Sequence, residues 1–291
     1  MTVTRHFAGK LKQIALLALM SVFATGLALG NSRAADIETL TKPAFTDGSA
    51  ATVDHATWDA LLKAHVMAGA DGTNRIGYAG FKAKDQAALK SYIKALETVQ
   101  PTKLGRNEAF AFWANLYNAK TIDIVLDAYP VKSIKDINLG GGLLASVTGG
   151  PWKAKVLKVA GVEMSLDDIE HGLLRPVFKD PRIHYAVNCA SIGCPNLSRD
   201  AFTGATLDTQ LDAGAKAYVN SPRGVRADPD GITASSIYNW FVADFGGDET
   251  GVIKHLKRYA DPLLKPKLES ITEIADYGYD WTLNDVTSIR P

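Results

Sequence analysis

Residues 107–128 read NEAFAFWANLYNAKTIDIVLDA, and this stretch decides the fold class. Phe110, Trp113 and Tyr117 recur at the three- and four-residue spacing of a helix, so they share one broad apolar face. Pro130 then ends the helix, because proline has no amide hydrogen to donate to the preceding turn. The stretch therefore predicts the strongest helix of the chain.

Shorter helices and hairpins are expected on either side of this helix. Apolar residues recur at helical spacing in five further segments, residues 58–65, 89–96, 207–219, 235–243 and 250–259. Hairpins are expected from residues 155–159 with 162–164 and from 225–226 with 232–233, and single strands over 183–189 and 274–281. Because strands and helices do not alternate regularly, we expect one mainly helical α+β domain with a small antiparallel sheet. A papain-like or transglutaminase-like arrangement is one form of this class.

The N-terminus is typical of a cleavable signal peptide. A basic start is followed by an apolar run over residues 14–29 and by small residues at 32–35. The run is shorter than the roughly 20 apolar residues of a transmembrane helix and is broken by polar residues. We therefore expect cleavage after Ala34, a periplasmic or secreted protein, and no stable membrane insertion after cleavage.

The mature chain is expected to be slightly acidic. Cleavage of residues 1–34 removes four of the 32 basic residues and none of the 31 acidic ones, which leaves a net charge of about −3. No basic patch favours a nucleic-acid partner. Residues 35–51 are polar and are predicted to form an extended lead-in, and residues 52–291 are predicted to form the single domain.

Polar residues gather in three otherwise apolar segments. The first segment is the long helix, the second is a helix that opens with the capping box Ser165 to Asp168, and the third covers residues 182–195. The candidate binding residues in these segments are Glu108, Asn118, Arg175, Arg182 and Asn188. They could line a cleft for a small-molecule or peptide ligand, or they could form a satisfied structural network, because buried polar groups need partners.

The two cysteines, Cys189 and Cys194, allow a catalytic hypothesis. Cys189 would be the nucleophile of a thiol-dependent hydrolase or acyltransferase, activated by an imidazole base that a third group orients. The candidate bases are His184 and His171, and the candidate orienting groups are Asn115 and Glu170. On a regular strand His184 and Cys189 would point to opposite faces, so the strand would have to end or bulge between them.

Two other roles are open to the cysteines. A disulfide between Cys189 and Cys194 is the default in an oxidising compartment. A zinc site could use both cysteines with His171 and His184, but one cysteine pair is a weak signature and no His-Glu-x-x-His motif is present. We expect neither a metal nor another cofactor.

The aromatic residues at 238, 240, 241 and 245 have helical spacing, and this spacing predicts that they lie in the core.

The chain resembles a bacterial and plant family of domains of unknown function, number 547. The resemblance rests on four motifs within residues 105–246, at residues 112–118, 166–175, 181–195 and 236–245. It implies no agreed activity and no catalytic residues, and plant members have an added N-terminal leucine-zipper region that this chain lacks. Whether the protein is an enzyme therefore stays open. A thiol hydrolase or acyltransferase is the leading hypothesis, and a non-catalytic binding or interaction domain with a structural disulfide is the alternative.

Overall fold

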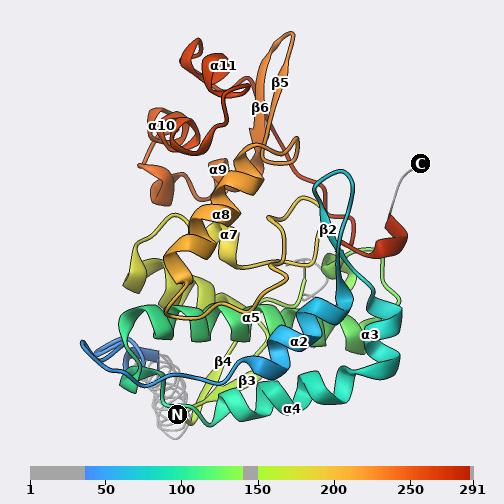
Figure 1. Ribbon diagram of the computed structural model, residues 1–291, viewed down its shortest axis with the longest axis vertical. Coiled ribbons are helices and arrows are strands. Elements are labelled where there is room, and N and C mark those ends of the chain that lie inside the picture. The colour runs from blue at the N-terminus through green and yellow to red at the C-terminus, as the bar shows by residue number, and fades with distance from the viewer. Residues whose placement is uncertain (1–36, 140–149, 289–291) are drawn as a thin grey trace, which may run out of the picture. The chain divides into compact units, whose positions relative to one another are not determined.

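Helix α5 (Arg106–Ala128) is surrounded by other elements along most of its length, as the computed structural model shows in Figure 1. Its 23 residues include eighteen that are buried, among them Ala111, Ala114 and Ala119, whose small side chains let neighbouring elements approach closely. The helix predicted over 107–128 is confirmed. The remaining helices pack against this element or against one another.

The structure describes residues 37–139 and 150–288. The chain divides into two units, Met1–Pro43 and Ala44–Pro291. The predicted signal peptide, residues 1–34, lies outside the described residues, as do residues 140–149. No helix within the described ranges is both long enough and apolar enough to cross a bilayer.

The N-terminal half of the second unit packs as helices around α5. They are α2 (Ala56–His65), α3 (Tyr78–Lys84) and α4 (Gln86–Glu97). Helix α4 packs through one apolar face, because its buried residues Leu89, Tyr92, Ile93 and Leu96 recur three and four positions apart. Strands β1 (Val66–Ala68) and β2 (Asn74–Ile76) form a hairpin after α2.

The C-terminal half has its own hydrophobic cluster around Tyr218, Tyr238, Phe245 and Leu256. It is built from α8 (Leu207–Val219), α9 (Ser236–Trp240), the 3₁₀-helix η5 (Val242–Phe245), α10 (Glu249–Tyr259) and α11 (Lys265–Glu269). The helices predicted over 207–219 and 250–259 are confirmed. The helix predicted over 235–243 is divided into α9 and η5.

The strands form small sheets, as expected for this class. Both predicted hairpins are confirmed, β3 (Leu157–Val159) with β4 (Val162–Met164) and β5 (Val225–Asp228) with β6 (Gly231–Ser235). Strand β7 (Asp276–Gly278) pairs parallel to β6 and completes a three-stranded sheet. This parallel pair is an addition to the antiparallel sheet that the sequence predicted. The described residues are about 49% helical and 11% strand, so the mainly helical α+β class is confirmed.

The strand predicted over residues 183–189 is wrong. Residues Ile183–Ala186 form a helical turn, α7, and the chain becomes extended only at Val187. All residues from 183 to 188 are buried, so an alternation of apolar and polar residues does not separate a core face from a solvent face here. The strand parity that separated His184 from Cys189 therefore does not apply.

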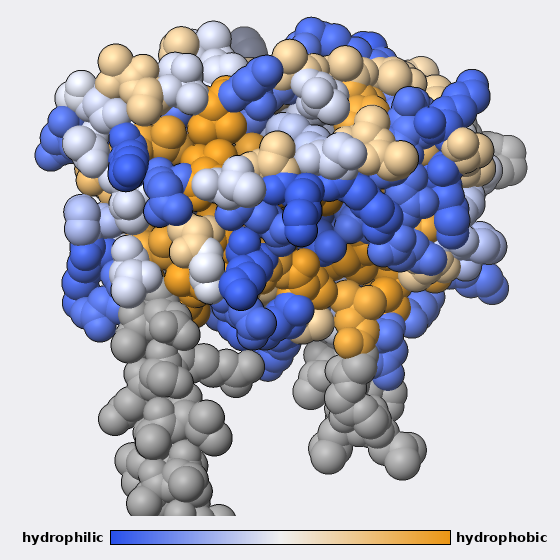
Figure 2. Space-filling view, turned by 90° about the horizontal axis from the view of Figure 1, so that it is seen from below, coloured by the Kyte–Doolittle hydropathy of each residue, from blue (hydrophilic) through white to orange (hydrophobic). Residues whose placement is uncertain are grey.

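The second unit leaves few large hydrophobic side chains exposed. Within the described residues they are Met67, Leu139, Trp240 and Leu263. Figure 2 shows one face of the molecule, on which hydrophilic residues surround smaller hydrophobic areas. Of the aromatic residues predicted to be core, Tyr238 and Phe245 are buried and Phe241 is partly buried. Trp240 contradicts the prediction, because 47% of its area is exposed.

Candidate functional site

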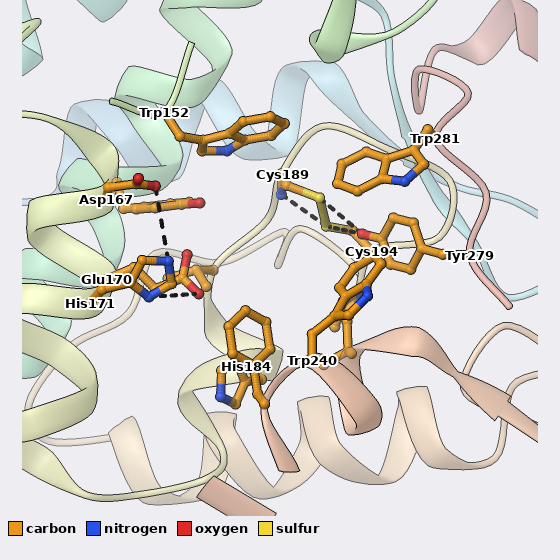
Figure 3. A pocket seen from close by; sticks show the side chains of 15 residues that line it. Trp152, Asp167, Glu170, His171, His184, Cys189, Cys194, Trp240, Tyr279 and Trp281 are labelled. Atoms are coloured by element: carbon orange, nitrogen blue, oxygen red, sulfur yellow. Dashed lines mark hydrogen bonds and ion pairs between the residues drawn. A yellow bond between two sulfur atoms is a disulfide. The ribbon is translucent and has the colours of Figure 1, made fainter. Parts of the chain in front are cut away.

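A cavity of about 180 Å³ joins residues from α5, the π-helix η4 (Asp168–Phe178), the segment after α7, α9 and the C-terminal segment. Aromatic rings make up much of its wall, contributed by Tyr117, Trp152, Trp240, Phe241, Tyr279 and Trp281. Its ionisable side chains are Asp167, Glu170, His171 and His184. Figure 3 shows the acidic residues and His171 on one side of the cavity and Trp240, Tyr279 and Trp281 on the other.

The aromatic side is a continuous cluster of rings. The Trp240 centroid lies 5.0 Å from that of Tyr279 and 5.8 Å from that of Trp281, and Trp281 lies 5.8 Å from Trp152. Such separations are typical of favourable aromatic pairs. Trp152, Tyr279 and Trp281 were missed by the sequence analysis. The concentration of aromatic residues in Tyr277-Gly-Tyr-Asp-Trp281 was the available signal.

Cys189 and Cys194 form a disulfide in the cavity wall, with their Cα atoms 6.2 Å apart. The Tyr279 hydroxyl lies 3.0 Å from the Cys189 sulfur and 3.1 Å from the Cys194 sulfur, and burial raises the pKa of this phenol. The Ser191 hydroxyl lies 3.3 Å from the Cys189 sulfur. The predicted disulfide is therefore present, and in this state neither sulfur is a thiolate.

The loop that carries the disulfide is held by backbone and arginine contacts. The Gly193 amide donates to the Asp280 carbonyl oxygen at 2.8 Å. The half-buried Arg223 guanidinium donates to the carbonyl oxygens of Ile192 and Cys194. A Cβ on Gly193 would lie 2.8 Å from the Asp280 amide nitrogen, so the close approach of these two segments requires glycine.

The two candidate bases belong to one polar cluster with Asp244. His184 Nε2 lies 2.7 Å from an Asp244 carboxylate oxygen, which also accepts from Arg175 Nε at 2.6 Å. Arg175 Nη1 lies 3.1 Å from His171 Nδ1. Hydrogen bonding to His184 first, and then to Arg175, lowers the pKa of Asp244 to about 2. Asp244 was not predicted as a site residue, although it lies within the motif at residues 236–245.

The π-helix η4 (Asp168–Phe178) positions the acidic side. The predicted capping box is confirmed, because the Asp168 amide donates to Ser165 Oγ at 3.1 Å and the Ser165 amide donates to the Asp168 carboxylate at 2.7 Å. A π-helix is rare and is frequently found at functional sites. Its first turns bring Glu170 and His171, with Asp167 just before them, to the cavity.

The Glu170 carboxylate accepts a hydrogen bond from the Tyr117 phenol. The carboxylates of Asp167 and Glu170 each lie 3.9 Å from a ring nitrogen of His171, beyond hydrogen-bond distance. Burial raises the pKa of Asp167, an effect that nearby His171 opposes. Burial also raises the pKa of the Tyr117 phenol, and the neighbouring Glu170 carboxylate raises it further. Asp167 was not among the predicted site residues.

The structure does not bring the other predicted residues into this cavity. The Asn115 amide donates to the Phe202 carbonyl oxygen at 2.8 Å and accepts from the Phe202 amide at 3.0 Å. Asn118 donates to Ala186 and accepts from the Asn188 amide, both at 2.8 Å. These side chains therefore tie α5 to neighbouring loops.

The side chains of the remaining candidate residues also make structural contacts. Glu108 accepts from the amides of Val53 and Gly204, both at 2.8 Å. Asn188 donates to the Pro195 carbonyl oxygen at 2.7 Å. Arg182 forms ion pairs with Asp180, Asp208 and Asp212.

The four-ligand zinc set is not assembled in this structure, because the two sulfurs are bonded to each other. Among residues 37–139 and 150–288, no group of three or more His, Cys, Asp or Glu side chains is arranged to hold a metal ion. The cysteine nucleophile with a histidine base is not assembled either, since the sulfurs contact the hydroxyl groups of Ser191 and Tyr279 and the Cys189 amide.

Residues 101–219 match a family model described as "Protein of unknown function, DUF547". The match contains α5, η4, both cysteines and α8, whereas Trp240, Tyr279 and Trp281 of the aromatic side follow it. No curated protein and no solved structure is significantly similar to the chain. The match supports the resemblance to the DUF547 family over residues 101–219.

Proposed function

We propose that this protein is an exported ligand-binding domain and that the aromatic cavity is its binding site. Export is supported by the basic, apolar and small-residue order of residues 1–34. Binding is supported by a cavity with mostly apolar walls and a few polar groups at one end, the common form of a small-molecule site.

One observation carries the binding proposal. Trp240 exposes 47% of its area although its ring packs against Tyr279 and Trp281. Leaving a large apolar side chain half exposed forgoes part of the hydrophobic stabilisation that full burial would give. A ligand that covers the ring would recover that stabilisation.

The competing thiol chemistry needs a free thiolate and an imidazole within about 3 Å of it. Here the Cys189 sulfur is bonded to Cys194 and contacts the hydroxyl groups of Ser191 and Tyr279. His184 is hydrogen-bonded to Asp244. Catalysis would therefore require reduction of the disulfide and rearrangement of the cavity wall, whereas binding requires neither.

Tryptophan fluorescence tests the proposal, because three of the five tryptophans line the cavity. The mature, non-reduced protein would be titrated with a panel of small neutral, cationic and anionic compounds and sugars, with thermal unfolding as a second readout. We expect at least one compound class to change the fluorescence and raise the unfolding temperature of the wild type.

Two variants locate the site. Trp240→Ala should lose the response, whereas Leu263→Ala, which removes a surface apolar side chain that is 82% exposed outside the cavity, should keep it. A response that survives in Trp240→Ala, or no response to any compound class, would contradict the proposed site.

A further inference from the structure

The cavity lining contains acidic side chains but no lysine or arginine among the described residues. The acidic side chains are those of Asp167 and Glu170. The nearest arginine of the polar cluster, Arg175, is paired with Asp244 at 2.6 Å. Lys155 is paired with Asp168. Lys153 acts on Asp167 only as a weaker influence than burial and His171. Two carboxylates and two imidazoles, those of His171 and His184, are therefore the ionisable groups of the cavity, and the carboxylates give it a negative end.

The aromatic walls also favour positive charge. The face of a tryptophan, tyrosine or phenylalanine ring attracts a cation within about 6 Å of the ring centre. Two rings of this wall already have such a neighbour: Lys135 Nζ lies 5.0 Å from the Trp281 centroid, and Arg175 Cζ lies 4.8 Å from the Phe241 centroid. Neither cation lines the cavity, so its interior surface is left for a ligand.

The size of the cavity and the hydrogen-bonding needs of the ligand narrow the class of ligand further. A cavity of about 180 Å³ accepts only a small molecule or the end of a larger one. A sugar would place several hydroxyl groups against apolar rings, where each unpaired polar group is costly. A trimethylammonium group carries charge without N–H groups that need acceptors, and its methyl groups pack well against aromatic faces.

We infer that the cavity binds a small organic cation with a trimethylammonium group, held between the rings of Trp240, Tyr279 and Trp281 and the carboxylates of Asp167 and Glu170. This inference rests on the proposed binding function and names its ligand class. The rings contact the methyl groups, and the two carboxylates supply the compensating charge across the cavity.

Choline and 3,3-dimethyl-1-butanol give a direct test, because they have nearly the same shape and differ in charge. Isothermal titration of the mature, non-reduced protein at neutral pH should show choline binding at least about tenfold more tightly than the neutral analogue. Glucose serves as the sugar comparison and should bind more weakly than choline.

Charge-neutral variants assign the effect to the carboxylates. The double variant Asp167→Asn, Glu170→Gln should bring the affinity for choline close to that for the neutral analogue while leaving the latter nearly unchanged. Asp230→Asn is the control, because this exposed acid in the β5–β6 turn does not line the cavity.

The outcomes separate this inference from the proposed function. Equal affinities for choline and its neutral analogue, tighter glucose binding, or no choline binding at millimolar concentration would overturn the cation class. The binding function would still stand if another compound class bound in a Trp240-dependent way. Failure of the whole panel would overturn both.

Discussion

Helix α5 and helix η4 both present polar side chains among apolar neighbours, and they differ in what those side chains contact. Asn115 and Asn118 on α5 exchange hydrogen bonds of 2.8–3.0 Å with backbone groups of neighbouring loops. Asp167 and Glu170, at the start of η4, have His171 nitrogens at 3.9 Å and face a cavity.

The difference separates structural from functional polar residues in this protein. A buried amide with both ends satisfied contributes to stability and specifies how segments pack. A carboxylate that is desolvated and has no cation within hydrogen-bond distance costs stability and remains available to a cationic ligand. From sequence the two sets were indistinguishable, because both are polar residues at helical spacing within apolar segments.

The largest expected effect is a loss of stability caused by a substitution in α5. Asn115→Ala should lower the free energy of unfolding by about 2–4 kcal/mol, because it leaves both the amide and the carbonyl group of Phe202 without a partner in the core. Urea denaturation measures this loss. Asp167→Asn is the comparison on the η4 side and should change stability by less than about 1 kcal/mol. Similar losses in the two variants would remove the distinction between the helices.

Opening the disulfide should have the next largest effect. Replacing both cysteines by serine should lower the free energy of unfolding by about 2 kcal/mol, because the bridge closes a short loop and constrains the unfolded chain only modestly. Urea denaturation of the variant, and of the wild type with and without reductant, measures the effect. A reduced protein as stable as the oxidised one would show that the bridge has no structural role.

Trp240→Ala should weaken choline binding by about tenfold and change the free energy of unfolding by less than about 1 kcal/mol, because the ring is half exposed. Titration calorimetry and urea denaturation measure the two effects separately. A large loss of stability with unchanged binding would place Trp240 with the structural residues.

Choline binding should depend on pH by a few-fold. Burial raises the pKa of Asp167, so its carboxylate takes up a proton at a higher pH than an ordinary aspartate as the pH falls. Protonation removes charge that the cation needs, so affinity should be full above this pKa and should decrease below it. The affinity for 3,3-dimethyl-1-butanol should not change with pH.

Other groups around Asp167 must be separated in that experiment. They are Glu170, His171, Lys153 and Asp168. Protonation of His171 would weaken cation binding in the same direction, so the profile is also measured in His171→Gln. A pH dependence that persists in Asp167→Asn and disappears in His171→Gln would assign it to the imidazole.

The smallest expected effect concerns Asp244 and acid stability. Its pKa in the folded protein is lowered to about 2, so its contribution to stability is complete above the ordinary aspartate pKa and is lost as the pH falls towards 2. Thermal unfolding between pH 5 and pH 2.5 should therefore show a steeper loss in the wild type than in Asp244→Asn. Parallel profiles would contradict the assignment.

The elements with strong local patterns were predictable. The apolar arc of α5, the capping box of Ser165 and Asp168, and the two hairpins depend on residues close together in sequence, and all are confirmed. The segment at 183–189 was not predictable in this way, because complete burial removes the contrast between its two faces.

The site was predictable only in part. Glu170, His171, His184 and Cys189 do line one cavity, and the disulfide was expected from compartment and spacing. Trp152 and Trp281 could not be assigned, because they meet across 129 positions of sequence, with no local pattern to relate them. Trp240 was assigned to the core because helical spacing does not show whether a ring faces the core or a cavity.

Alkylation of the non-reduced protein between pH 5 and pH 9, read by intact mass, tests most directly whether Cys189 and Cys194 form a structural disulfide or include a reactive thiol. We expect a chain two hydrogens lighter than the reduced form, with no adduct until reductant is added. Rapid alkylation of Cys189 below pH 7 without reductant would reveal an activated thiolate and contradict this expectation.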